Sequence, residues 1–189
     1  GGLLGLRVND LNQSWGIEKK HLINYTYPSD EELQSVGVTG LFLGYFFEWD
    51  GLSNALIAQA NGFTTYAKKV EGSMVNYENL DNHQTGIHDY FKYLKFGFGR
   101  ATDIASLHIR RGRITREQGI KIVTESEGRF PWEYLGKSLQ EILDPLDLGV
   151  PEFEAICDRF TNKALFVLET DGTLKKDRHR NLEKMTPLA

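Results

Sequence analysis

The chain has 189 residues and a net charge of −4, and 40% of its residues are hydrophobic. That apolar content excludes a disordered chain, and the negative charge argues against general nucleic-acid binding, which favours a basic surface. No apolar run reaches the ~18 residues that a membrane-spanning helix needs, and a single cysteine, Cys157, permits no internal disulfide, so we expect no membrane insertion and a cytoplasmic protein.

Residues 1–82 predict the end of an α/β domain. Ser29 and Glu32 form a capping box that opens a short helix. Residues 38–47, VTGLFLGYFF, are apolar and β-prone, which predicts a buried strand.

A helix is predicted over residues 51–60, with Asp50 as its cap. A strand followed by a helix indicates a β–α unit, so part of an α/β sheet is expected. The polar loop at residues 71–82 comes next, and long loops in compact domains are often functional.

Residues 83–163 predict a helical, substrate-binding region. The amphipathic stretch 84–95 and capping boxes at Thr115 and Ser138 mark helices, and Pro151 suits a first helical position. A further helix is predicted from about residue 101 to residue 111. Residues 164–189 predict a small hairpin, turning at the Asp-Gly pair 171–172, and a mobile charged tail. The predicted fold class is therefore an α/β fragment dominated by α-helices.

Positive charge gathers in residues 95–118, where six cationic and two anionic side chains give +4. Gly99 directly precedes Arg100 and a helix, and free backbone N–H groups at a helix N-terminus favour an anion. Asp103 could hold Arg100 in place by helical spacing. Further guanidinium groups, which suit phosphate or carboxylate, follow at Arg110, Arg111 and Arg113.

Plainer readings of this cluster stay open. Two glycines before a helix often make only a turn, and arginines at a helix C-terminus usually offset its dipole in solvent. A helix-turn-helix resemblance over residues 115–123 is weak.

The polar loop and the next helix offer a second candidate site. A ribose or sugar hydroxyl could be bound by Glu71, Asn79, Asp81, His88 and Lys92. The alternatives are a solvated loop of turn formers and an ordinary exposed histidine. No spacing here matches a zinc site, so no metal site is predicted.

Trp49 and Asp50 would lie at the carboxyl end of the predicted strand, where α/β sheets bind ligands. A capping aspartate beside a packing tryptophan is an equal alternative.

Four stretches resemble one family: FLGYFFEWDGLSNALIAQ, EGSMVNYENLDNHQTGIHDYFKYLKFGFGRATD, HIRRGRITREQG and FEAICDRFTNK. They are similar to the C-terminal half of the N-acetyl sugar amidotransferases, over about residues 35–165. These enzymes belong to the PP-loop ATP pyrophosphatase superfamily, of adenine nucleotide alpha hydrolase-like fold, and act in lipopolysaccharide O-antigen and flagellin-sugar biosynthesis.

The resemblance implies an ATP-dependent ligase-like reaction. ATP, with Mg²⁺, would adenylylate the oxygen of an N-acetyl group on a nucleotide-linked or acidic sugar, and ammonia would displace AMP to leave an acetamidino group. Glutaminase and cyclase-like partner proteins would supply the ammonia.

The family's Ser-Gly-Gly-Xaa-Asp-Ser phosphate loop does not occur in this sequence. We therefore expect a C-terminal portion that is inactive alone, binds no cofactor tightly and contributes substrate contacts. A non-catalytic docking module for the ammonia-supplying partners is the alternative.

Overall fold

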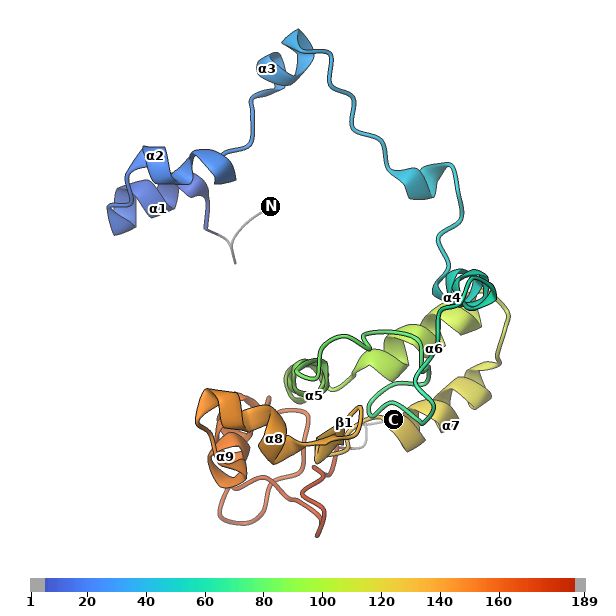
Figure 1. Ribbon diagram of the computed structural model, residues 1–189. Helices are drawn as coiled ribbons and strands as arrows, with labels where there is room; N and C mark the ends of the chain where they lie inside the picture. Colours follow the sequence, from blue (N-terminus) through green and yellow to red (C-terminus); the bar gives the residue numbers. More distant parts are fainter. Residues whose placement is uncertain (1–5, 186–189) are drawn as a thin grey trace. The chain divides into compact units, whose positions relative to one another are not determined.

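The computed structural model describes residues 6–185 of the chain (Figure 1). The chain divides into two compact units, Gly1–Asp50 and Gly51–Ala189, each with its own set of helices. The described part is dominated by helices, as the sequence predicted, and its paired strands form only one small two-stranded sheet.

The first unit consists of short helices. Ser29 caps one of them: its hydroxyl accepts a hydrogen bond from Glu32 N (3.2 Å), and the Glu32 carboxylate accepts one from Ser29 N (2.8 Å). The predicted capping box is therefore confirmed. The elements are α1 (Val8–Trp15), α2 (Lys19–Leu22), the 3₁₀ turn η1 (Ile23–Tyr25), α3 (Asp30–Ser35) and η2 (Leu43–Tyr45).

The strand predicted at residues 38–47 is wrong. This stretch contains only the turn η2 in otherwise irregular chain, and the side chains of Phe42 and Tyr45 are 89% and 87% exposed. A strand needs neighbouring strands to satisfy its backbone groups, and the described part of the first unit contains none. The expected β–α unit is therefore absent from residues 6–185.

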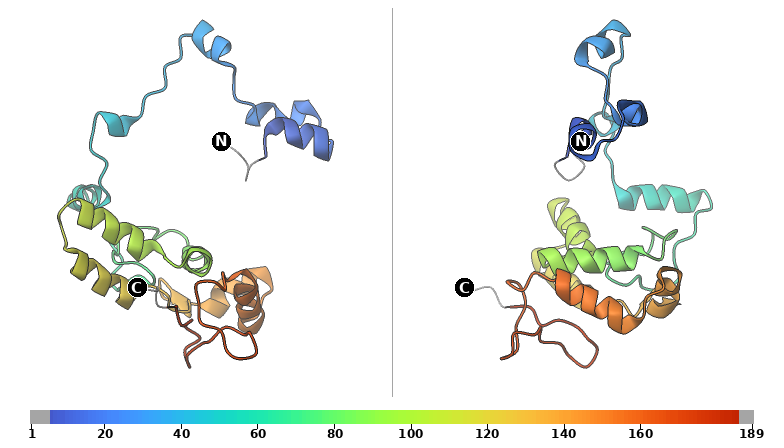
Figure 2. Two further views of the ribbon diagram at one scale, coloured as in Figure 1. Left: turned by 180° about the vertical axis from the view of Figure 1, so that it is seen from behind. Right: turned by 90° about the vertical axis from the view of Figure 1, so that its left-hand side faces the viewer.

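The second unit begins with α4 (Gly51–Ala60), which occupies the range that the sequence predicted. Helix α6 packs against α7, and α9 packs against both α5 and α8 (Figure 2). The remaining elements are α5 (Thr85–Phe96), α6 (Arg100–Arg110), α7 (Arg116–Ser126), β1 (Glu133–Tyr134), β2 (Lys137–Ser138), α8 (Leu139–Leu143), η3 (Asp144–Leu146) and α9 (Val150–Phe160).

Capping side chains set where these helices start. Thr115 and Ser138 each accept a hydrogen bond from the backbone N–H three residues on, at 3.2 and 3.3 Å, so both predicted capping boxes are present. Gly97 ends α5 in the left-handed conformation (φ 75°), which allows the chain to turn into α6 within three residues.

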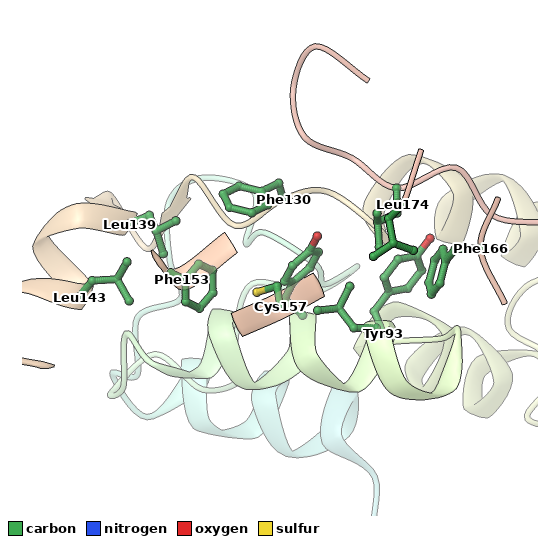
Figure 3. Packing of buried hydrophobic residues seen from close by; sticks show 11 residues of the cluster. Tyr93, Phe130, Leu139, Leu143, Phe153, Cys157, Phe166 and Leu174 are labelled. Carbon is green, nitrogen blue, oxygen red and sulfur yellow. The ribbon is translucent and has the colours of Figure 1, made fainter. Parts of the chain in front are cut away.

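The main core fills the space between α5, α8, α9 and residues 165–185, the C-terminal segment (Figure 3). The Tyr93 ring of α5 packs edge-on against Phe166 at 5.5 Å, and Phe130 packs against Phe153 at 6.0 Å. Cys157 lies in the same cluster, where burial raises the pKa of its thiol to about 12. The thiol is therefore a packing group, inert at neutral pH.

A smaller cluster holds the polar loop in place. Val70, Tyr134 and Ile142 are its buried members, and every residue from 71 to 80 is buried or half-buried. The loop is thus packed rather than solvated. Because residues 61–82 share a cluster with residues 134–142, the compact unit runs through the boundary expected at residue 82.

Three stretches of the C-terminal segment, around residues 167, 175 and 183, are joined to one another by backbone hydrogen bonds. Val167 N donates to Glu183 O (2.9 Å), Glu183 N to Lys175 O (3.2 Å), and Lys175 N to Val167 O (2.9 Å). The three buried side chains Phe166, Leu174 and Leu182 stand eight residues apart. The predicted turn at residues 171–172 is present within this arrangement, with Gly172 at φ 83°. The tail expected to be mobile is instead hydrogen-bonded to residues 165–175 as far as Met185, and Leu182 within it is buried in the main core.

Candidate functional site

A buried ion pair joins α5 to the first residue of α6. Arg100 Nε and Nη2 donate to the two carboxylate oxygens of Asp89 at 2.6 and 3.0 Å. The Asp89 side chain is 8% exposed, and Glu78 lies 3.7 Å from Arg100 Nη1. Burial opposes the charge of Arg100, but the hydrogen bonds and charges of the carboxylates outweigh it and raise the Arg100 pKa. The pair fixes the corner between the two helices.

Asp103 does not hold Arg100, contrary to the expectation from helical spacing. Asp103 pairs with Lys92 instead, and Lys92 also lies 4.9 Å from the centre of the Phe98 ring. Asp89, eleven residues before Arg100, is the partner. Helical spacing compares only residues of α6 with one another, whereas the carboxylate that binds Arg100 lies on α5.

The N-terminus of α6 already carries a carboxylate from the protein itself. Glu127 Oε1 accepts a hydrogen bond from Thr102 N at 2.5 Å, and Glu127 Oε2 accepts one from Thr102 Oγ1 at 2.9 Å. Glu127 therefore satisfies a free N–H group and complements the positive end of the helix dipole. The anion that the sequence predicted at this terminus is supplied within the chain.

A pocket of about 120 Å³ opens beside this corner. Its lining includes four aromatic side chains, of which Trp132, at 44% exposure, is the most solvent-accessible. The lining comprises Glu71, Gly72, Gly86, Asp89, Tyr90, Tyr93, Gly99, Arg100, Ser126, Glu127, Gly128, Arg129, Phe130, Pro131, Trp132 and Glu133.

Glycines give the pocket its shape. A Cβ on Gly86 would lie 2.6 Å from the Tyr134 ring, and a Cβ on Gly128 would lie 2.6 Å from the Tyr93 hydroxyl. Gly128 also has φ 75°, a conformation that side chains disfavour. The walls therefore approach one another more closely than any other residue would allow at these two positions.

The charges of the pocket favour cations over anions. Four carboxylates line it, against two guanidinium groups, and Asp89 neutralises one of those two. Burial, together with the nearby Glu133 carboxylate, raises the pKa of Glu71, whose Oε2 also accepts a hydrogen bond from Leu135 N at 3.3 Å. A phosphate placed here would meet more carboxylates than guanidinium groups, which disfavours anion binding in this pocket.

The sequence of the second unit matches a known family. Residues 61–179 match the model of the LPS biosynthesis protein WbpG-like, C-terminal domain, and this match spans more than half of the chain. The chain belongs to this WbpG-like family. Comparison with curated proteins gave no match. Every residue that lines the pocket lies within the matched range, so the pocket is a feature of the WbpG-like domain.

The predicted arginines do not converge in the WbpG-like domain. Arg100 is the first residue of α6, whereas Arg110 is the last, and Arg111 and Arg113 follow beyond it. At 1.5 Å per residue the two ends of the helix are roughly 15 Å apart. Arg110, Arg111 and Arg113 are exposed, so the structure separates these three from the pocket rather than gathering four guanidinium groups at one terminus.

The other predicted residues fall into two groups. Glu71 and Gly99 line the pocket. Asn79 does not line it; it is half-buried in a left-handed conformation (φ 55°), and its carbonyl oxygen lies 3.5 Å from the Tyr134 hydroxyl. Asp81 is exposed outside the pocket. The His88 side chain is 77% exposed, although its ring Nδ1 lies 3.2 Å from the buried Asp89 carboxylate.

Trp49 and Asp50 belong to the first unit, not to the WbpG-like match. Trp49 is 74% exposed and Asp50 is buried. Because residues 38–47 form no strand, the argument that placed these two side chains at the carboxyl end of a strand no longer applies.

Sequence reasoning missed the pocket residues between α7 and β1. Arg129 and Trp132 lie in the irregular stretch after α7, and Glu133 is the first residue of β1; no motif marks them. The dense aromatic content of residues 130–134 was the one available signal.

Within residues 6–185, no group of His, Cys, Asp and Glu is arranged to hold a metal ion. In the same range, no helix combines the length and apolar character needed to cross a membrane.

Proposed function

We propose that this WbpG-like domain binds the sugar in an ATP-dependent amidotransferase of LPS biosynthesis. The observation that carries the proposal is the pocket at the α5–α6 corner, whose lining combines aromatic rings with carboxylates and guanidinium groups. Sugar hydroxyls need hydrogen-bond donors and acceptors, and the apolar face of a sugar ring needs an apolar wall. The pocket offers both within the family domain.

In the proposed reaction the acetyl group of an N-acetyl sugar becomes an acetamidino group. Ammonia nitrogen forms a new bond to the acetyl carbon, and the acetyl oxygen departs with the co-reactant ATP as AMP, pyrophosphate being the other product. The described residues provide no cradle for the triphosphate, so in this proposal ATP and Mg²⁺ bind to a PP-loop part of the enzyme outside residues 6–185. Ammonia would come from glutamine through glutaminase and cyclase-like partners, in the cytoplasm.

The residues of this domain would bind and orient the sugar. The Arg100–Asp89 pair keeps the corner of α5 and α6 fixed. Trp132 is the most exposed ring of the lining, and the Arg180 guanidinium lies 5.1 Å from the centre of that ring. Arg129 is an exposed residue of the pocket lining, and in this proposal it would meet the phosphates of a nucleotide-linked sugar.

Calorimetric titration with UDP-N-acetylglucosamine tests this proposal. Trp132→Ala and Arg129→Gln should each weaken binding about tenfold, because each removes one recognition element. Lys121→Gln, which removes an exposed cation of α7 outside the pocket, should bind like the parent chain. Equal affinity in all four proteins, or no binding by the parent, would count against a sugar site here.

A further inference from the structure

Three hydroxyl groups of the pocket lining have no hydrogen-bond partner among residues 6–185. We propose that these hydroxyls, of Tyr90, Tyr93 and Ser126, form a subsite that binds the neutral N-acetyl group of the ligand by hydrogen bonds. This inference rests on the proposed function, because that function supplies an N-acetyl sugar. It adds which chemical group enters the pocket and which side chains bind it.

The three residues are deeply buried, which makes the lack of a partner informative. Tyr90 and Tyr93 of α5 and Ser126, the last residue of α7, are 6%, 9% and 5% exposed. Folding therefore removes most of the water around these side chains, and a buried hydroxyl ordinarily gains a hydrogen-bond partner in exchange. Here the three side chains line the pocket instead, so a partner has to come from what the pocket contains.

Ser126 departs from the usual behaviour of a helical hydroxyl. Thr124 Oγ1, in the same helix, donates to Ile120 O at 2.9 Å, and Thr161 Oγ1, at the end of α9, donates to Cys157 O at 2.7 Å. Such bonds to the carbonyl one turn earlier are common for serine and threonine in helices. Ser126 makes none within the described chain, so its hydroxyl remains available to a ligand.

All three hydroxyls can be reached from outside the protein. In the part of the chain that the structure describes, every side-chain nitrogen or oxygen that solvent cannot reach has a hydrogen-bond partner. Since these hydroxyls have none, each keeps some accessible surface, and the pocket is the open space beside them. Tyr93 also lines a neighbouring pocket of about 430 Å³, whereas Tyr90 and Ser126 line only the first of the two.

The three groups lie around one small volume. Tyr90 and Tyr93 share a face of α5, and their rings stack with centres 6.5 Å apart. A Cβ on Gly128 would lie 2.6 Å from the Tyr93 hydroxyl, so this hydroxyl lies against the chain just beyond Ser126. The pocket, of about 120 Å³, has room for an N-acetyl group among them.

An N-acetyl group has the donor and acceptor that these hydroxyls require. Burial is the main cause that raises the pKa of Tyr90 and of Tyr93 above the ordinary value of 10, so each O–H stays protonated and can donate at neutral pH. The carbonyl oxygen of an amide can accept from two such donors, and Ser126 Oγ can accept from the amide N–H. The group is neutral, so it avoids the repulsion that an anion would meet from the carboxylates of the lining.

Two glycosides that differ in one substituent test the subsite. Methyl N-acetylglucosaminide carries an acetamido group where methyl glucoside carries a hydroxyl, and N-methylacetamide is the amide without the sugar. Each is titrated into the ¹⁵N-labelled chain, with the Trp132 indole and Gly128 backbone N–H signals as reporters. We expect the N-acetyl glycoside to bind about tenfold more tightly than the glucoside, through its additional hydrogen bonds, and N-methylacetamide to shift the same signals saturably.

Variants that each remove one oxygen identify the binding groups. Tyr90→Phe, Tyr93→Phe and Ser126→Ala should each weaken binding of the N-acetyl glycoside and of N-methylacetamide about fivefold and leave the glucoside unchanged, because one hydrogen bond to the amide is lost. None should lower the melting temperature, because these hydroxyls bond no group of the described chain. Tyr66→Phe is the matched control and should bind like the parent, because Tyr66 is half-buried in the smaller cluster, outside the pocket.

Each contrary result has a distinct meaning. No binding of N-methylacetamide, amide binding that all three variants leave unchanged, or a lowered melting temperature in all three would overturn the inference. Equal affinity for the two glycosides would leave the proposed function standing and remove this inference alone. Amide binding that the variants weaken, without binding of either glycoside, would leave the hydroxyl subsite standing and count against the sugar function.

Discussion

Glu127 and Thr102 are joined by two hydrogen bonds, through the backbone N–H (2.5 Å) and the hydroxyl (2.9 Å) of Thr102. The contact links the residue that follows α7 to the first turn of α6, 25 positions earlier in the chain. It gives the first turn of α6 a side-chain hydrogen-bond acceptor, which the N-cap residue Gly99 cannot provide. An added anion would therefore have to displace a side chain that is already in place.

Removing that carboxylate should create the anion site that the sequence suggested. Glu127→Ala should lower stability by about 1 kcal/mol, as the loss of a helix cap does. Phosphate should then raise the melting temperature of Glu127→Ala, because the helix terminus is free, and leave the parent chain unchanged. Thermal unfolding with and without phosphate, with sodium chloride matched for ionic strength, measures both. A parent chain stabilised as much as the variant would contradict an internally satisfied terminus.

The Asp89–Arg100 pair should be strongly coupled. Asp89→Asn leaves a mostly buried guanidinium without its bidentate partner, and we expect a loss of about 3 kcal/mol. Arg100→Met together with Asp89→Asn should cost less than the sum of the two single changes, because no unpaired charge remains. Urea unfolding of the four proteins gives the coupling free energy. Additive losses would show that the pair contributes nothing beyond its separate side chains.

Local signals in the sequence predicted local structure well. The capping boxes at Ser29, Thr115 and Ser138 fix helix starts within a few residues, and each is present in the structure. Such signals work because donor and acceptor lie within one helical turn, so no distant part of the chain can change the outcome.

Long-range relationships could not be predicted in the same way. The partner of Arg100 comes from the preceding helix, and the carboxylate at the N-terminus of α6 comes from beyond the next one. The apolar run at residues 38–47 had the composition of a strand, but the described part of its unit, residues 6–50, contains no strand that could pair with it. Charge summed along residues 95–118 therefore overstated the positive potential, because carboxylates from elsewhere pack against it.

The raised pKa of Glu71 predicts how stability depends on pH. Burial is the main cause and Glu133 adds to it, so the folded chain holds the proton more tightly than the unfolded chain, whose ordinary value is 4.5. The stabilisation from protonated Glu71 is complete below that value and is lost as pH rises through the raised pKa. Glu71→Gln keeps a neutral side chain at every pH, so its stability relative to the parent should increase from pH 4 to pH 7.

Melting temperatures of both proteins across that range provide the measurement. Glu169→Gln, at an exposed carboxylate, is the control and should follow the parent at each pH. A difference between Glu71→Gln and the parent that stays constant, or shrinks, with rising pH would show that Glu71 is not destabilised by its charge.

The C-terminal segment should unfold together with the helices. Leu182 is 8% exposed and belongs to the main core, whereas Met185, three residues later, is 43% exposed. Leu182→Ala should cost roughly 2–4 kcal/mol through lost burial and the cavity left behind, and Met185→Ala should stay within about 0.5 kcal/mol.

Ion pairs strengthen that expectation. Lys176 bonds Glu154 (2.8 Å) and Asp158 (2.7 Å) of α9, and Arg180 bonds Glu154 at 2.5 Å, so the segment is held to α9 at several points. Urea unfolding followed by helical circular dichroism should give one transition for the second unit, shifted to lower urea in Leu182→Ala. A helical transition that Leu182→Ala leaves unmoved would mean that residues 165–185 fold apart from α5 and α9.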